Sequence, residues 1–152
     1  MTKDQLKEHL QNLKPDIEFV EEGKYLTAIL PSAILHEIAQ NLRNSEETQF
    51  DFLFCQTAID WPEYIDVVYH LRSTILGHTV VLKARINDRE KARVDSVFDL
   101  WKTADFHERE IYDLFGVVFE NHPDLRRIFL DDDWVGYPLR KDYVDEINIV
   151  EL

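Results

Sequence analysis

Apolar and polar residues alternate along three consecutive stretches in the middle of the chain. A period of two is typical of β-strands that bury one face. Short polar links separate the stretches, so the strands are predicted to pair in chain order as an antiparallel meander. The predicted strands are residues 49–59, with Phe50, Phe52 and Phe54 on one face, residues 64–72, with Ile65, Val67, Tyr69 and Leu71 inward, and residues 79–86, with Val80, Leu82, Ala84 and Ile86 inward.

Two amphipathic helices and two short strands are predicted before the meander. The first helix begins after Thr2, which has the spacing of a capping box with Gln5, and Pro15 ends it. Ser32 is predicted to cap the second helix. The apolar face of that helix is Ile34, Leu35, Ile38, Ala39 and Leu42, and the two strands are residues 17–20 and 25–30.

A third helix is predicted between Asp105 and Gly116. Asp105 and Glu108 have capping-box spacing, with Asp105 as the N-cap. Gly116 follows the last apolar pair and is placed to end the helix with a positive φ. Arg109 and Asp113 lie four residues apart, so they are predicted to pair along the helix.

The remaining stretches before residue 121 are short. Residues 87–94 are charged and predicted to form a mobile loop, and Ser96 is placed to cap one helical turn over residues 97–102. Residues 117–119 are predicted as a short strand. Strands in a run followed by helices indicate an α+β fold, with a mainly antiparallel sheet and flanking helices.

Two regions are predicted. Residues 1–120 form the α+β domain, with its central helix at 106–115, and residues 121–152 form an extended segment. The part at 121–143 has no period of 2 or 3.6, yet it is too apolar for disorder. For the last nine residues of the chain, 144–152, a loose tail and a docking strand remain alternative predictions.

Aromatic and arginine side chains dominate residues 121–143, and these residue types favour the cores of protein–protein interfaces. We expect an ordered coil that lies across another protein. A coil of this kind is expected to gain little inside its own domain and to be mobile in the isolated chain. The predicted interface and its structural network are Glu108, Arg109, Glu110, Asp113, His122, Arg126, Arg127, Trp134, Tyr137, Arg140, Lys141 and Tyr143.

Charge excludes some function classes. The net charge is −13, from 30 acidic and 17 basic residues. This balance disfavours a free nucleic-acid binder and charge-driven binding to an anionic membrane. Partner steering and simple solubility remain as alternative explanations of the acidic charge.

The cysteine content and the search for targeting segments give little further information about function. The single cysteine, Cys55, cannot form a disulfide or a cluster within the chain and is expected to be a buried, inert thiol. No run approaches the roughly 18 apolar residues of a membrane span. The N-terminus lacks the features of a signal or transit peptide.

No catalytic, cofactor-binding or metal-binding residue is predicted on this chain. The six histidines have no ligand spacing, Asp131-Asp132-Asp133 lacks the EF-hand pattern, and the four glycines form no phosphate-binding loop. The charged helix residues have two interpretations, acid–base catalysts or an ion-pair network that pins the coil, and we favour the network. Replacing Glu110 or Arg126 by alanine is then expected to loosen the coil.

Three motifs follow one another near the end of the chain: HEREIYDLFG at 107–116, HPDLRRIFL at 122–130 and DDWVGYPLRKDY at 132–143. Together they resemble the signature of the 30 kDa subunit family of respiratory complex I, the C (or J) subunit of NADH-quinone oxidoreductase. AIDWP at 58–62, VVYHL at 67–71 and DLW at 99–101 also fit. Because so little follows Tyr143, the longer C-terminal extension of some members is expected to be absent.

The resemblance implies a cofactor-free structural subunit in the hydrophilic arm of a proton-pumping NADH (or other donor):quinone oxidoreductase. The complex would be the enzyme, a translocase, peripheral here to the cytoplasmic face of a bacterial inner membrane or its stromal or matrix equivalent. Implied partners are the 49 kDa-type (D/H) quinone-site subunit and the B and I iron–sulfur subunits. Iron–sulfur clusters, quinone and FMN/NADH would belong to those neighbours and to the rest of the complex.

Two alternatives stay open. One is the equivalent subunit of a membrane-bound hydrogenase or ferredoxin-linked complex. The other is a stand-alone acid–base enzyme that uses the cluster at 107–127.

Overall fold

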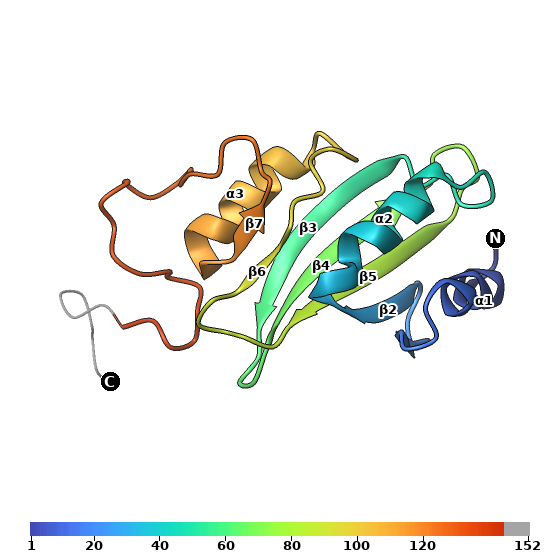
Figure 1. Cartoon of the computed structure of the whole chain (residues 1–152), viewed down its shortest axis with the longest axis horizontal. Helices are drawn as coiled ribbons and strands as arrows, with labels where there is room; N and C mark the ends of the chain where they lie inside the picture. The colour runs from blue at the N-terminus through green and yellow to red at the C-terminus, as the bar shows by residue number, and fades with distance from the viewer. Residues whose placement is uncertain (145–152) are drawn as a thin grey trace.

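The computed structural model describes residues 1–144 and shows helices packed on one face of a mixed β-sheet (Figure 1). The fold is α+β, as the sequence predicts. The elements are α1 (Lys3–Leu13), β1 (Glu18–Val20), β2 (Leu26–Pro31), the 3-10 turn η1 (Ser32–Ile34), α2 (Leu35–Asn44), β3 (Phe52–Asp60), β4 (Ile65–Arg72), β5 (Thr79–Ile86), β6 (Arg93–Asp95), α3 (Ala104–Phe115) and β7 (Val118–Glu120).

The main sheet has five strands in the order β1-β2-β5-β4-β3. The predicted antiparallel meander of β3, β4 and β5 is confirmed. β2 pairs in parallel with β5, with Leu26 opposite Val80, and this pairing was not predicted. A strand's own pattern sets its buried face, but it does not identify the neighbour across a long connection.

One hydrophobic core lies between the sheet and the helices. The predicted inward residues of β4 and β5 are all buried. Leu6 of α1, Leu35 of α2 and Ile111 of α3 belong to the same core, so the three helices cover one face of the sheet. The opposite face carries no helix from residues 1–144.

β3 departs from the prediction at its start. Phe50 precedes the strand and is fully buried, whereas Phe52 and Phe54 point to the uncovered face. The register shifts between Leu53 and Cys55, which is the mark of a β-bulge. Cys55 is consequently half-buried, and the expectation of a buried thiol is wrong.

Helix starts follow the prediction only in part. The Thr2–Gln5 capping box at α1 is confirmed, since each side chain bonds the other's backbone N–H. Ser32 instead opens η1, and Ile34 is the N-cap residue of α2, with no side-chain cap. A serine is equally suited to begin a 3-10 turn. Because such a turn comes first here, the α-helix begins three residues later than predicted.

The stretch predicted as the loop 87–94 ends in strand β6. β6 pairs in parallel with β7, Val94 opposite Phe119, in a separate two-stranded sheet. Each strand has only three residues, and an alternation of apolar and polar residues cannot be recognised over so short a stretch. Ser96 caps the following turn by accepting a hydrogen bond from the N–H of Phe98.

Candidate partner-binding site

The site is formed by α3 and the irregular segment from residue 121 to 143, which we call the strap. Figure 1 shows the strap leaving β7 as a coil, looping out around α3 and coming back beside the connection between β5 and β6. It contains no helix or strand in residues 121–144, as predicted. Side chains of α3 and of the end of β3 hold it in place.

Asp113 of α3 is the main attachment point. Its Oδ2 accepts the backbone N–H groups of Ile128, Phe129 and Leu130 at 3.3, 2.8 and 3.1 Å. Its Oδ1 accepts Arg127 at 3.0 Å. Burial alone would raise the pKa of Asp113, but the bonds from Phe129, Leu130 and Arg127 outweigh it and hold the pKa below its usual value. The ionised carboxylate of Asp113 therefore links the helix to the coil through hydrogen bonds.

Arg127 organises the strap from within. Its guanidinium donates to the carbonyl of Asp113 at 3.0 Å and to the carbonyls of Trp134 and Gly136 at 3.1 and 3.0 Å. It also lies 5.0 Å from the ring centroid of Tyr137, a cation–π distance. Several donors in one plane let a single arginine fix two turns of the coil.

Arg109 does not pair with Asp113, so the predicted helix ion pair is wrong. Its guanidinium donates instead to the carbonyls of Arg126 and Arg127 at 3.2 and 3.1 Å. Unpaired carbonyls of an irregular coil need donors, and these contacts outcompete a surface pair worth a few tenths of a kcal/mol.

Two glycines let aromatic rings approach the backbone. Gly116 ends α3 with φ of 76°, as predicted, and a Cβ at this residue would lie 2.6 Å from the ring of Tyr137. Gly136 has φ of 91°, and a Cβ there would lie 3.0 Å from the ring of Tyr143. Both rings thus pack where any side chain would collide.

A second attachment joins the strap to the sheet. Buried Asp60, the last residue of β3, accepts the backbone N–H of Lys141 at 2.9 Å and also pairs with Arg89. Burial opposes ionisation of Asp60, yet Arg89 and the Lys141 N–H lower its pKa. Arg140 donates to the carbonyl of Arg89 at 2.9 Å, which closes the link. Asp60 and Arg89 were not among the predicted site residues, because nothing local connects them to the strap.

Glu108 has a different place from the one predicted. α3 begins at Ala104, with Thr103 as N-cap residue, so the Asp105–Glu108 capping box is wrong. The hydroxyl of Thr103 bonds the carbonyl of Leu53 instead. Glu108 is fully buried and accepts hydrogen bonds from Gln56, Ser96 and the N–H of Val97. Burial raises its pKa to about 7, although these bonds act in the opposite direction.

Other predicted residues lie at the start of the strap and on α3. His122 binds the carbonyl of Asp105 at 3.2 Å and accepts the N–H of Asp124, which ties the start of the strap to α3. Arg126 is exposed and pairs with Asp124. Glu110 is exposed, and its side chain makes no hydrogen bond or ion pair within residues 1–144. The contacts thus assign the holding function to Asp113 and Arg127 rather than to Glu110 and Arg126.

The strap presents apolar side chains outward. Val135 is 88% exposed and Phe129 is 65% exposed, while Leu139 and Phe106 of α3 are also exposed. Their backbones are held by the bonds described above, so the side chains are displayed from a fixed frame. Large apolar side chains displayed from a fixed coil are candidates for an interaction surface.

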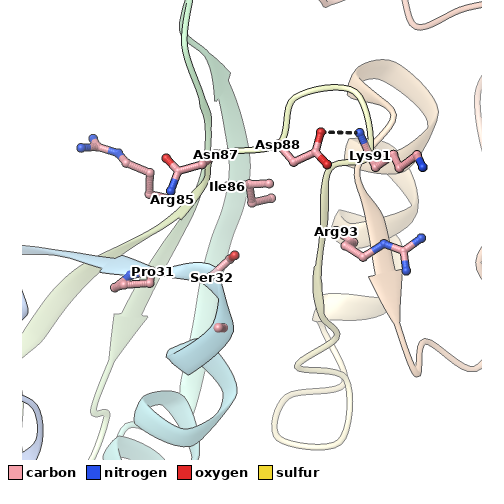
Figure 2. A pocket seen from close by; sticks show the side chains of 9 residues that line it. Pro31, Ser32, Arg85, Ile86, Asn87, Asp88, Lys91 and Arg93 are labelled. Carbon is pink, nitrogen blue, oxygen red and sulfur yellow. Dashed lines mark hydrogen bonds between the residues drawn. The ribbon is translucent and has the colours of Figure 1, made fainter.

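The open pocket in Figure 2 lies elsewhere, where β2 and β5 end. It is lined by Ser32, Lys91 and Arg93, among others. Arg93 is already paired with Glu120, and Figure 2 shows Arg85 pointing away from the hollow.

Among residues 1–144, no three His, Cys, Asp or Glu side chains gather as metal ligands. None of the helices described there is long and apolar enough to cross a membrane.

Comparison with known proteins places the chain in a family. Residues 28–147 match the model described as "Respiratory-chain NADH dehydrogenase, 30 Kd subunit". The chain is 42% identical over 140 residues to the C subunit of NADH-quinone oxidoreductase from Moorella thermoacetica, covering 90% of this chain and 91% of that protein. It is 49% identical over 125 residues to the C/D subunit from Bacteroides thetaiotaomicron, covering 75% of this chain and 23% of the relative.

The chain thus spans about a quarter of the length of the C/D relatives. A solved structure described as the membrane-bound sulfane sulfur reductase, an archaeal respiratory membrane complex, contains a similar chain. The TM-score is 0.77 at 29% identity, over 95% of this chain and 86% of that chain. Matched over most of its length by the family model, this chain belongs to the 30 kDa subunit family of respiratory-chain NADH dehydrogenase.

Proposed function

We propose that the chain is a structural subunit of a membrane-associated NADH-quinone oxidoreductase, and that the strap fastens it to a neighbouring subunit of the quinone-reducing module. The observation that carries this proposal is the strap itself. A coil with no secondary structure is fixed by Asp113 and Arg127, yet its apolar side chains Val135 and Phe129 face solvent. Such a surface is stabilised further when another protein covers it.

The proposal assigns no redox centre or catalytic residue to this chain. Three of the charged groups that an acid–base enzyme would use have structural partners: Glu108 and Asp113 are buried in hydrogen bonds, and Arg109 binds two carbonyls. Iron–sulfur clusters, quinone and FMN/NADH would be held by other subunits of the complex. The chain would sit peripherally on the cytoplasmic face of a bacterial inner membrane, or the equivalent face in an organelle.

The partner we propose for the strap is the 49 kDa, D-type subunit. Relatives named as C/D subunits support this assignment, because they join a chain like this one to a D part in one polypeptide. The B and I iron–sulfur subunits are proposed as further neighbours.

A second candidate concerns the electron donor and acceptor. The similarity to a chain in a sulfane sulfur reductase complex favours considering an equivalent subunit in a hydrogenase-type or ferredoxin-linked assembly. Genes adjacent to this one discriminate the two: flavin-bearing NADH-oxidising subunits are expected for the first proposal and missing for the second.

The test is purification of the tagged chain from membranes in mild detergent. We expect it to migrate with a large assembly that contains a D-type subunit and oxidises NADH with quinone. Val135→Asp places a charge on an 88% exposed side chain and is expected to release the chain from the assembly without unfolding it. Gln11→Asp, at an exposed residue of α1, is the matched control and should leave the assembly intact. A monomer that binds metal and turns over a substrate on its own would overturn the proposal.

A further inference from the structure

The sheet face opposite the helices is a second surface without a covering element in residues 1–144. We call it the outer sheet face. The strand register places Cys55, His70 and Val81 in one row across it, and Thr57, Val68 and Lys83 in the next. Its residues alternate with the core residues of the same strands.

Aromatic side chains are exposed at one end of the outer sheet face. Phe52 and Phe54 are 42% and 40% exposed, and their rings stack with centroids 6.0 Å apart. Phe54 also packs against His70 at 5.6 Å. Exposing two adjacent phenylalanine rings to water is unfavourable in free energy. A protein that covers the rings would remove this unfavourable contribution.

The charge of this face differs from that of the whole chain. Its strand residues include three basic ones, Arg72, Lys83 and Arg85, and two acidic ones, Glu18 and Asp66, for a net of +1. The whole chain carries −13. Arg85 is neutralised by a bidentate pair with buried Asp66, at 3.0 and 3.1 Å.

Two basic groups are therefore left over. Within residues 1–144, Arg72 donates only to the hydroxyl of Thr79, and neither it nor Lys83 has a carboxylate partner. Burial and the nearby charge of Lys83 both lower the pKa of His70, so the imidazole adds no charge of its own at neutral pH.

We propose that the outer sheet face is a second docking surface, for a protein neighbour in the assembly that covers Phe52 and Phe54 with apolar side chains and sets carboxylates against Arg72 and Lys83. This inference rests on the proposed function, because it requires the assembly. A second copy of the chain fits less well, because a two-fold contact through this face would bring the unpaired cations together. The chain would then bridge two neighbours, one at the strap and one at the sheet.

Cys55 provides an internal probe, since it is the single cysteine and lies half-buried on this face. The sulfur of the thiol bonds one carbon of the maleimide double bond and a proton adds to the other, with no leaving group, so the labelling rate reports access. We expect Cys55 to react about tenfold more slowly in the purified assembly than in the free chain, because a packed interface excludes the reagent. Thr57→Cys in a Cys55→Ser background repeats the measurement at an exposed residue of the same face. Equal rates in assembly and free chain at both sites would overturn the proposal.

The charge requirement is tested with a water-soluble carbodiimide applied to the assembly. The reagent activates a carboxylate and leaves as its urea, so an amide forms only where an amine already contacts that carboxylate. We expect mass spectrometry to find Lys83 joined to an Asp or Glu of another subunit. Lys83→Gln should abolish this link, whereas Lys91→Gln, on the β5–β6 loop, should not. A link between two copies of this chain, or no link at Lys83, would overturn the proposal.

The outcomes separate this inference from the proposed function. If the chain purifies alone, the assembly itself is absent and the proposed function fails. If the chain purifies in the assembly with Cys55 and Thr57→Cys freely labelled, the proposed function stands and the second surface fails.

Discussion

The Oδ2 atom of Asp113 lies 2.8 Å from the backbone nitrogen of Phe129, sixteen residues further along the chain. The bond joins the last turns of α3 to a coil that has no backbone ladder of its own. Ile128 and Leu130 donate to the same oxygen, so one carboxylate replaces several backbone acceptors. The geometry explains how an irregular segment keeps one conformation.

Asp113→Asn should therefore loosen the strap. The amide keeps one acceptor oxygen but loses the charge and turns an NH₂ group toward donors. Breaking a buried, hydrogen-bonded ion pair costs about 3 kcal/mol, and we expect a loss of that order in urea unfolding. Asp132→Asn, on an exposed residue of the strap, should change stability little. A stability for Asp113→Asn equal to that of the control would contradict the assignment.

Much of the candidate site was visible in the sequence, but the pairing of its residues was not. The residue types Asp, Arg and Tyr near the third helix predicted a pinned coil. Which arginine pairs with which carboxylate depends on the path of residues 121–143. Because that path is irregular, it cannot be deduced from the spacing of residues in the sequence. Arg109 and Asp113 therefore suggested a helix pair, whereas each reaches the strap instead.

The same contacts reverse one expectation about the isolated chain. The sequence predicted a strap that gains little from its own domain, but Asp113, Arg127 and Asp60 bind its backbone directly. We now expect the amides of Phe129, Leu130 and Lys141 to be protected from hydrogen exchange without any partner. The exposed strap amide of Val135 should exchange fast and serves as the internal reference. Uniformly fast exchange across residues 128–141 would show that these bonds do not hold.

The fold followed from the sequence where apolar residues recur with a period of two. In β4 and β5 every predicted inward side chain is buried, and the intervening Asp66, Val68, Thr79 and Val81 are buried as well. The prediction failed where tertiary contacts displaced local rules, as at Thr103, whose hydroxyl bonds Leu53 rather than capping α3. It also failed for β6, whose three residues are strand only because β7 lies beside them. The prediction for residues 144–152, a loose tail or a docking strand, lies outside the described part except for Val144.

Buried Glu108 gives the fold a predicted pH dependence. Burial raises its pKa to about 7 in the folded chain, against an ordinary value of 4.5. The folded state therefore binds more protons between pH 4.5 and 7, so the free energy of unfolding is largest below this window and falls as pH rises through it. The shift corresponds to about 3 kcal/mol. Urea unfolding at pH 5 and pH 8 should show a decrease of that order from this group.

Glu108→Gln mimics the protonated acid and should flatten this decrease, so that the variant is more stable than the original chain at pH 8. Glu110→Gln, two residues along α3 on its exposed side, is the control and should leave the pH profile unchanged. A pH profile for Glu108→Gln that parallels the original chain would contradict the predicted titration.

Gly116→Ala separates backbone strain from ring packing. At φ of 76° an alanine is strained, and its Cβ would lie 2.6 Å from the ring of Tyr137. Gly77 has nearly the same φ, 77°, and a Cβ added there would have nothing within 4 Å, so Gly77→Ala measures the strain alone, about 1 kcal/mol. We expect Gly116→Ala to cost about 1 to 2 kcal/mol more, because Tyr137 must move. In a Tyr137→Ala background the excess should disappear, as a double-mutant cycle of unfolding free energies would show. Equal costs at the two glycines in the presence of Tyr137 would mean that the ring does not press on the end of α3.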